Sequence, residues 1–329
     1  MPDATPPKAL IVGISGPSSS GKTTLARLLQ RIFNGVAGSP GTDPLHTFII
    51  HEDDFYYPDD QIPYTTTPSG TRIQDWDTAA AIDTTFLAQA LAYVRTNGCL
   101  PPRLRSKEDQ NEQTESGVPD SLIAELRAGV GRDLGGRGGP APTIAFLEGF
   151  LLYSPLGTQT GVDTGSGSGG GSSETAVALQ PVHAQIQLPL FLPASYENVK
   201  QRREARSGYV TIGPAPGPTE GDKAKTSETG DGTREIDMEG EDDRPPQNFW
   251  TDPPGYVDDI VWPRYVQDHA WLLVPRGAEG DLLSRVGDGT EVREDVGVRV
   301  APGKGEQGMS EMVRWAVREI VDSYLAATI

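Results

Sequence analysis

KALIVGISGPSSSGKTTLARLLQRIF, residues 8–33, is the stretch of sequence that decides the fold. Residues 8–14 form a short and nearly continuous apolar run, as is typical of a buried parallel strand. Residues 24–33 repeat apolar side chains at helical spacing. The segment between them matches G-x-x-x-x-G-K-[ST] and consists of Gly16, Pro17, Ser18, Ser19, Ser20, Gly21, Lys22 and Thr23. A strand, this loop and a helix in that order predict a phosphate-binding loop.

The residue types of this loop suit the phosphates of a nucleoside triphosphate. Its glycines let the backbone turn N–H groups toward phosphate oxygens, and the following helix adds the positive end of its dipole. Lys22 brings a point charge to the β- and γ-phosphates, and the hydroxyl of Thr23 can ligate Mg²⁺. We therefore predict ATP as co-substrate and Mg²⁺ as cofactor, with Thr24 completing the ATP-binding stretch.

Strand-like and helix-like segments alternate along the rest of the chain. We expect strands at residues 47–51, 143–147, 184–192 and 298–301, and helices at residues 78–96, 196–206 and 310–326. This alternation predicts an α/β fold of the P-loop nucleoside/nucleotide kinase type, with a doubly wound parallel sheet in three α/β/α layers and a lid. We expect one domain over residues 8–329, with flexible Gly-, Pro- and charge-rich insertions at residues 107–142, 157–173 and 212–248.

The overall composition excludes several classes of protein. A net charge of −18 disfavours a general nucleic-acid binder and a protein that docks on anionic lipid. No apolar run approaches the roughly 20 residues of a membrane span, and residues 1–8 lack the pattern of a secretory signal. We expect a cytoplasmic protein without nucleic-acid or membrane partners, and the sequence leaves nuclear entry open. The histidines and the single cysteine do not have the spacing of metal ligands. We expect structural roles for these residues, which are His46, His51, His183, His269 and Cys99.

Acidic and aromatic residues follow the second expected strand. Asp53 and Asp54 come directly after residues 47–51, at the sheet edge where open α/β folds bind ligands. A carboxylate there can accept the proton of an attacking hydroxyl, although an isolated acidic pair also occurs as a helix cap or a solvated turn. Phe55 and Tyr56 come next and can stack on a planar base, which favours a functional site.

Trp76 and Asp77 again pair a ring with a carboxylate. A carboxylate can accept both hydroxyls of a ribose, and Asp77 is equally suited to cap the helix expected after it. Glu148 follows the strand at residues 143–147, where a carboxylate near Mg²⁺ or its waters is common.

The helix expected at residues 196–206 is rich in arginine. Arg202 and Arg206 are four residues apart and share a face, while Arg203 points aside. Guanidinium groups suit phosphate oxygens and transition-state charge, and the alternative is a solvated helix face paired with acidic loops.

Taken in order, these segments resemble the nicotinamide riboside kinases, within the uridine kinase-like group of P-loop kinases. The resemblance covers most of the chain outside the insertions and is carried by IVGISGPSSSGKTTLARLLQ (11–30), HEDDFYYP (51–58), QDWD (74–77), FLEGFLLY (146–153), VKQRREARSGYV (199–210) and DPPGYVDDIVWPRYV (252–266). The first segment is shared with uridine kinases. EGFLL and the PGY…VWP pattern point to the riboside kinases.

The resemblance implies a set of site residues. Catalysis is expected from Asp53 as base and from Lys22. Metal binding is expected from Thr23, Asp53 and Glu148. Beyond the phosphate loop, ATP contacts are expected from Arg202, Arg206, Gly305 and Glu306. Riboside contacts are expected from Asp53, Asp54, Phe55, Tyr56, Trp76, Asp77, Arg203 and Tyr209. Two departures from the family pattern are Trp76, where a tyrosine is expected, and the long acidic insertion in the lid.

The resemblance therefore implies an enzyme that transfers phosphate from ATP to the ribose 5′-hydroxyl of nicotinamide riboside, in NAD salvage. A first alternative is a uridine/cytidine kinase, because the same chemistry serves another base. A second is a nucleotide-dependent regulatory binding protein, which the three insertions favour because such segments often recruit partners.

Overall fold

The protein is described here by a computed structural model that covers residues 8–37, 43–106, 115–134, 143–155, 171–214, 236–240, 245–275 and 277–327. Within this part of the chain, a five-stranded sheet has the order β2-β5-β1-β6-β9. Its strands are β1 (Ala9–Ser15), β2 (Thr47–His51), β5 (Thr143–Gly149), β6 (Leu188–Phe191) and β9 (Arg299–Val300). All neighbouring strands run parallel. Their carboxyl ends therefore meet at one edge of the sheet, where ligands of such folds bind.

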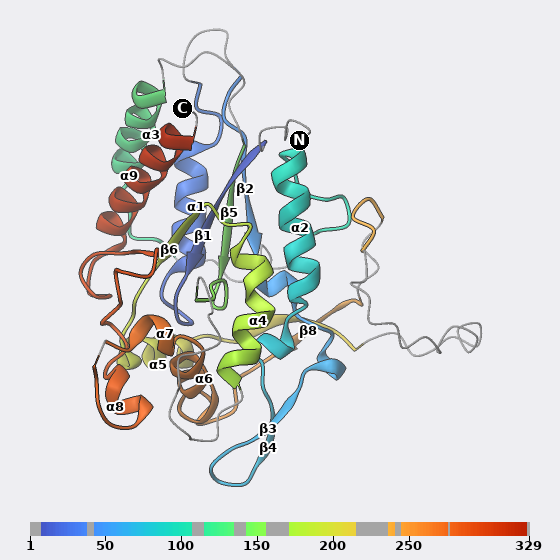
Figure 1. Ribbon diagram of the computed structural model, residues 1–329. Coiled ribbons are helices and arrows are strands. Elements are labelled where there is room, and N and C mark those ends of the chain that lie inside the picture. Colours follow the sequence, from blue (N-terminus) through green and yellow to red (C-terminus); the bar gives the residue numbers. More distant parts are fainter. Residues whose placement is uncertain are drawn as a thin grey trace.

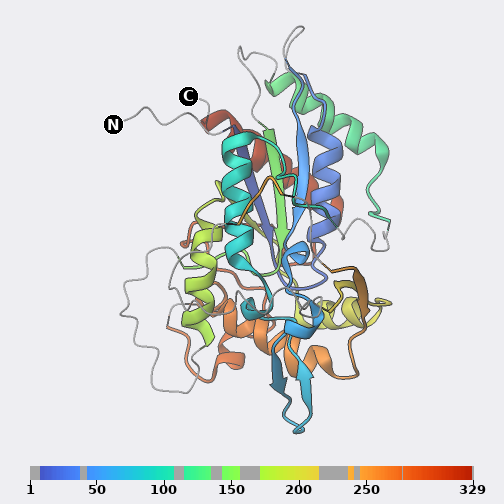
Figure 2. The ribbon, with the colours of Figure 1, turned by 90° about the vertical axis from the view of Figure 1, so that its right-hand side faces the viewer.

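Helices cover both faces of this sheet. Figure 1 shows α1, α3 and α9 together on one side and α2 and α4 on the other, and the turned view in Figure 2 agrees. These helices are α1 (Lys22–Phe33), α2 (Thr84–Asn97), α3 (Asp120–Leu134), α4 (Gly171–His183) and α9 (Met309–Ala327). A hydrophobic core lies on each face of the sheet, and successive residues of β1 pack into opposite cores. Ile11 packs toward α2, while Val12 and Ile14 pack toward α1 and α9. The predicted doubly wound α/β fold is confirmed.

Shorter elements gather below the carboxyl edge of the sheet (Figure 1). Among the helices they are α5 (Tyr196–Glu204), α6 (Trp262–Asp268), α7 (Ala270–Leu273) and α8 (Leu282–Val286), with a π-helix at Val257–Val261. Single turns of 3₁₀-helix lie at Glu52–Phe55, Asp59–Gln61 and Ala79–Ala81. Two hairpins complete the set, β3 (Tyr64–Thr66) with β4 (Arg72–Gln74), and β7 (Tyr209–Ile212) with β8 (Gln247–Trp250).

Helix α3 corrects the sequence-based expectation for residues 107–142. Residues 120–134 form a regular helix, and Leu122, Ile123, Val130 and Leu134 are buried against the core of α1 and α9. The polar composition of the flanking residues hid this apolar stripe. Helix α4 was likewise not expected, and its first residues, 171–173, lie inside the range predicted to be an insertion. Residues 107–114, 135–142 and 156–170 lie outside the described part.

Three details of the structure refine the sequence-based expectations. Helix α2 begins at Thr84, because Asp83 accepts a hydrogen bond from the Phe86 N–H and so takes the capping role that Asp77 was considered for. Strand β6 tolerates Pro189, since β9 pairs only with the two residues after it and no ladder bond needs the missing N–H. Of the range 212–248, the structure describes residues 212–214, 236–240 and 245–248, and the rest lies outside the described part.

Candidate active site

The phosphate loop joins β1 to α1 at the carboxyl edge of the sheet. Gly16 has a φ of 153°, and a Cβ atom at this position would lie 2.3 Å from the carbonyl oxygen of Leu192. Gly21 has a φ of 96° and immediately precedes α1. Both positions therefore require glycine. The Ser19 and Ser20 hydroxyls are buried without a hydrogen-bond partner in the described part of the chain, which suits a loop that binds a polar ligand.

Lys22 and Thr23 start α1 and face the cavity. The Lys22 ammonium donates to the Pro17 carbonyl at 2.9 Å. Burial lowers its pKa, although Glu148 and Asp53 oppose this shift. The Thr23 hydroxyl donates to Glu148 Oε1 at 2.9 Å. The loop thus carries a positive charge directly beside a hydroxyl–carboxylate pair.

Glu148 lies in β5 beside the end of β2. His51 Nδ1 lies 2.7 Å from its Oε1, so one carboxylate oxygen contacts both His51 and Thr23. Burial alone would raise the pKa of Glu148, but the hydrogen bond and charge of His51, with Lys22 and Thr23, hold it below its ordinary value. The parallel pairing of β2 with β5 places the buried His51 opposite Glu148, so His51 acts on the cavity through this carboxylate.

Asp53 follows β2 in a turn of 3₁₀-helix and lines the same cavity. Burial and the nearby Glu148 charge raise its pKa to about 6, against the attraction of Lys22. A carboxylate with such a pKa is ionised at neutral pH and can still accept a proton, as a general base must.

Glu52, one residue earlier, is fully buried. Its Oε2 accepts hydrogen bonds from the Phe150 and Leu151 N–H groups at 2.7 and 3.0 Å. A Cβ atom on Gly149 would lie 2.3 Å from this oxygen, so the contact requires glycine after Glu148. Burial raises the pKa of Glu52 to about 8. The side chain connects the turn that carries Asp53 to the end of β5.

A buried ion cluster lies at the other side of the cavity. The Arg203 guanidinium donates to both oxygens of Asp77 at 2.9 and 3.1 Å, and to both oxygens of Asp252 at 2.7 and 3.3 Å. The exposed fractions of the Arg203, Asp77 and Asp252 side chains are only 6%, 8% and 17%. Burial raises the pKa of Asp77, an effect that the Arg203 charge opposes. Two carboxylates thus surround one guanidinium.

Aromatic rings enclose the space next to this cluster. The ring centroid of Trp76 lies 5.4 Å from that of Tyr56 and 5.6 Å from that of Trp250 on β8. The Tyr56 hydroxyl donates to the Trp76 carbonyl at 3.0 Å. The Trp250 indole N–H donates to Asp252 at 2.9 Å, which links this wall to the ion cluster.

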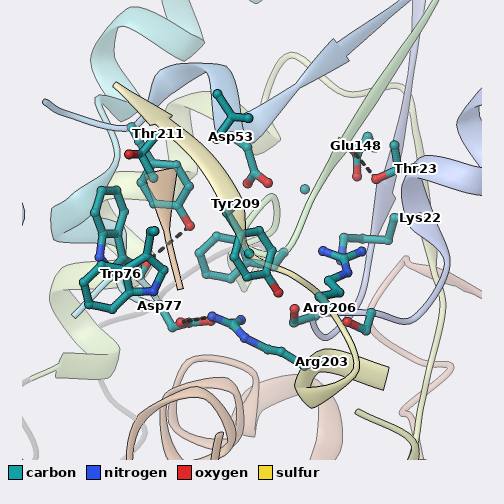
Figure 3. A pocket seen from close by; sticks show the side chains of 18 of the residues that line it. Lys22, Thr23, Asp53, Trp76, Asp77, Glu148, Arg203, Arg206, Tyr209 and Thr211 are labelled. Carbon is teal, nitrogen blue, oxygen red and sulfur yellow. Dashed lines mark hydrogen bonds and ion pairs between the residues drawn. The ribbon is translucent and has the colours of Figure 1, made fainter. Parts of the chain in front are cut away.

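The phosphate-loop residues and the residues around Trp76 line one cavity of about 610 Å³. We call the side formed by Lys22, Thr23 and Glu148 the phosphate-loop end, and the side formed by Trp76, Asp77, Arg203 and Trp250 the Trp76 end. Figure 3 shows Asp53 between Glu148 and Trp76, with Tyr209 at the centre of the view. Of the residues predicted from the sequence, the cavity brings together Ser18, Ser19, Gly21, Lys22, Thr23, Thr24, Asp53, Tyr56, Trp76, Asp77, Glu148, Arg203, Arg206 and Tyr209.

Other predicted residues do not line this cavity. Gly16, Pro17 and Ser20 belong to the loop but do not line the cavity, and Arg202 donates to the Ser19 carbonyl at 3.4 Å. Gly305 and Glu306 form a turn beyond β9, where Gly305 packs against the backbone of residues 193–194. Asp54 is buried.

Phe55 is placed differently from its expected position at the substrate. Its ring is 1% exposed and packs against Phe86 with a centroid distance of 5.0 Å, so it cannot stack on a base. The chain turns so that Asp53 and Tyr56 face the cavity while Asp54 and Phe55 face the core. The assignment of Phe55 to the substrate is therefore wrong.

Sequence reasoning missed Trp250 and Asp252. They lie two and four residues beyond the acidic range 212–248, and the pairing of β7 with β8 brings this part of the chain beside Arg203. Asp252 heads the DPPGY segment that carried part of the resemblance, which was the available signal.

Among the described residues, the cavity offers a metal hard oxygen donors: the Thr23 hydroxyl and the Glu148 carboxylate at the phosphate-loop end, and the Asp53 carboxylate between the two ends. No three His, Cys, Asp or Glu side chains form a metal-binding group in the described residues. This donor set fits a cation such as Mg²⁺, which keeps several waters and is completed by substrate phosphates. None of the described helices combines the length and apolar character needed to cross a bilayer.

Comparisons with known proteins give a consistent result. No family model matches the chain. The chain is 27% identical over 322 residues to the nicotinamide riboside kinase of Schizosaccharomyces pombe, a match that covers 96% of this chain and 98% of the relative. Identity is 24% over 285 residues to the nicotinamide riboside kinase of Saccharomyces cerevisiae, and 24% over 275 residues to that of Eremothecium gossypii. These two matches cover 85% and 84% of this chain, and 86% and 82% of the relatives.

The matched regions make up between 84% and 96% of this chain. Relatives that are kinases imply a small nucleoside and ATP as ligands, with a divalent metal. The resemblance to the nicotinamide riboside kinase family, which the sequence motifs carry, is confirmed by relatives matched along nearly the whole chain.

Proposed function

We propose that this protein uses ATP and Mg²⁺ to phosphorylate the ribose 5′-hydroxyl of nicotinamide riboside, giving nicotinamide mononucleotide. One observation carries the proposal: a single cavity has the phosphate loop at one end, the Trp76–Asp77–Arg203 group at the other and Asp53 between them. The names of the three relatives support the same substrate. We propose that one domain carries the whole site.

The proposed reaction is an in-line phosphoryl transfer. Asp53 accepts the proton of the ribose 5′-hydroxyl. The 5′-oxygen forms a bond to the γ-phosphorus while the bond between the γ-phosphorus and the β-phosphate oxygen breaks, and ADP leaves. Lys22 and Arg206 stabilise the negative charge that spreads over the transferred group. Thr23, Glu148 and Asp53 would hold Mg²⁺, which neutralises phosphate charge when bound.

The Trp76 end supports a cationic acceptor. The charges of Asp77, Arg203 and Asp252 sum to −1 in a buried site, because two carboxylates face one guanidinium. The pyridinium ring of nicotinamide riboside is positively charged, whereas uridine and cytidine are neutral. Indole and phenol rings also attract a cation placed over their faces. Trp76, Trp250 and Tyr209 line this part of the cavity.

The test is turnover by the purified full-length protein. ATP and Mg²⁺ would be supplied with nicotinamide riboside, uridine or cytidine in parallel, and product masses recorded. We expect phosphate to be gained on nicotinamide riboside with a kcat/KM at least about tenfold above that of the pyrimidines, the effect of about 1.4 kcal/mol. Equal or better turnover of uridine would refute nicotinamide riboside as the preferred substrate. ATP consumption that does not change with any nucleoside would refute the nucleoside kinase activity.

A further inference from the structure

Tyr256 belongs to the PGY pattern of the sequence, yet it does not line the cavity. It is 2% exposed and precedes the π-helix Val257–Val261. Gly255 before it has a φ of 81°, and the Tyr256 N–H donates to the Pro253 carbonyl at 3.1 Å. This turn directs the Tyr256 side chain into the molecule, behind the Trp76 end.

The Tyr256 hydroxyl connects two backbone groups of the segment that carries Trp76. It accepts a hydrogen bond from the Trp76 N–H at 3.0 Å and donates one to the Gln74 carbonyl at 3.2 Å. The donor and an acceptor capacity of the phenol are thus both used. Gln74 is the last residue of β4 and Trp76 lies two residues beyond it. Both are outside the main sheet, so no ladder of that sheet holds them.

The Tyr256 ring supports the other members of the Trp76 end. The Trp250 ring meets it edge-on with a centroid distance of 5.9 Å, and the Arg203 guanidinium carbon lies 5.6 Å from its centroid. One buried side chain therefore contacts the backbone of Trp76, the ring of Trp250 and the guanidinium that holds Asp77.

We propose that Tyr256 is a positioning residue for the nucleoside acceptor: it acts through Trp76 and Arg203, fixing the wall on which the base and ribose bind. The inference rests on the proposed function, and it assigns a role to the PGY segment. Loss of the hydroxyl leaves the Trp76 N–H without its partner inside the protein, which costs far more than the loss of a solvated hydrogen bond. The phosphate-loop end contains no contact to Tyr256 and should be unaffected.

A neighbouring tyrosine provides a matched control. Tyr265 on α6 is also buried, with 6% exposure, and lies in the same core. Its hydroxyl has no hydrogen-bond partner among the residues that the structure describes. Tyr256→Phe and Tyr265→Phe therefore remove the same atom from two buried rings, one bonded to the Trp76 segment and one not.

The experiment measures steady-state kinetics of the full-length protein and both variants, using the nucleoside that the wild-type protein phosphorylates best. In Tyr256→Phe, we expect KM for the nucleoside to rise about tenfold, with kcat and KM for ATP changed less than about threefold. Tyr265→Phe should match the wild type. An unchanged nucleoside KM in Tyr256→Phe, or an equal change of both KM values, would overturn the inference, as would the same loss in Tyr265→Phe.

A second variant covers the case in which Tyr256→Phe does not fold. Gly255→Ala strains the turn before Tyr256 at its positive φ, while the nearest atom to the added Cβ is Asp259 Oδ2 at 3.9 Å. We expect the same selective rise in nucleoside KM, and an unchanged KM would again overturn the inference. Failure of the proposed function is distinguishable, since it would be seen in the wild-type protein as absence of transfer to any nucleoside.

Discussion

The two ends of the cavity are built in different ways. The phosphate-loop end comes mainly from one continuous stretch, residues 16–24, whose geometry depends on two glycines and the start of α1. The Trp76 end combines Asp77, Arg203 and Trp250, which are far apart in the sequence. A local motif therefore specifies nucleotide binding, whereas acceptor binding depends on how distant elements pack. Variants at the first end should affect chemistry, and variants at the second should affect stability and substrate choice.

The largest expected effect is at Asp53, between the two ends. Asp53→Asn removes the proposed proton acceptor, and we expect kcat to fall by about 100- to 10,000-fold. ATP affinity, measured by calorimetry, should stay within a few-fold of wild type, because the phosphate loop is unchanged. Asp60→Asn, an exposed position a few residues later, should keep full activity. A large loss of ATP affinity in Asp53→Asn would instead show that this carboxylate serves mainly to bind the nucleotide and metal.

Arg203→Met tests how strongly the Trp76 end depends on its ion cluster. The change leaves Asp77 and Asp252 without their shared partner in a buried site. We expect the free energy of unfolding in denaturant to fall by about 3–5 kcal/mol. Arg314→Met, which breaks the exposed pair with Glu125, should cost less than about 1 kcal/mol. Equal losses in the two variants would show that the buried cluster adds no special stability.

Asp252→Asn sharpens the comparison at the level of substrate choice. The variant keeps the shape of the side chain but removes one negative charge of the cluster. We expect kcat/KM for nicotinamide riboside to fall about tenfold, with a smaller loss for a neutral nucleoside. Asp295→Asn, which disrupts an exposed pair with Arg293, is the control for loss of charge far from the cavity. Parallel losses for charged and neutral substrates would contradict a charge-based preference.

The smallest expected effect concerns two neighbouring groups outside both ends. Burial raises the pKa of Asp268 to about 6 and lowers the pKa of His269 to about 4. Between about pH 4 and pH 6, Asp268 is protonated more often in the folded protein than in the unfolded chain. The contribution of Asp268 to the free energy of unfolding is therefore lost as pH rises toward 6. Between about pH 4 and pH 6.5, His269 is protonated less often in the folded protein than in the unfolded chain. The contribution of His269 to the free energy of unfolding is therefore lost as pH falls through this range.

The two contributions oppose each other over the same pH range. Asp268→Asn leaves only that of His269, so the free energy of unfolding should fall more steeply from pH 6.5 to pH 4 than in the wild type. Denaturant titrations at several pH values measure this slope. Asp322→Asn, at an exposed position of α9, should keep the wild-type slope. A slope that is unchanged in Asp268→Asn would mean that this carboxyl does not titrate in the folded protein as described.

The sequence predicted the parallel sheet and the phosphate loop because both depend on local patterns. The apolar runs of β1, β2 and β5 and the loop after residue 15 all lie within a few residues of their expected positions. Helix α3 was missed although Asp120 and the spacing of Leu122, Leu126 and Val130 were visible signals of a helix start and an apolar stripe. Its polar flanks were given too much weight.

The Trp76 end could be predicted only in part. Trp76, Asp77 and Arg203 belong to recognisable segments, but nothing in the sequence places Asp252 on Arg203 or Trp250 beside Trp76. The burial of Phe55 beside the accessible Tyr56 was equally invisible, because it depends on the direction of one turn after β2. Contacts between distant segments are set by packing of the whole fold, and no local spacing encodes them.

The segment between β7 and β8 can change in length without moving the cavity residues on either side of it. The Gly213 N–H donates to the Pro246 carbonyl at 2.7 Å, so the chain leaves the hairpin and returns to it at the same point. Lengthening a segment closed in this way costs only about 0.6 kcal/mol for each doubling. We therefore expect residues inserted between Gly213 and the α2 contact of Ile236 to leave Arg203, Trp250 and Asp252 in place.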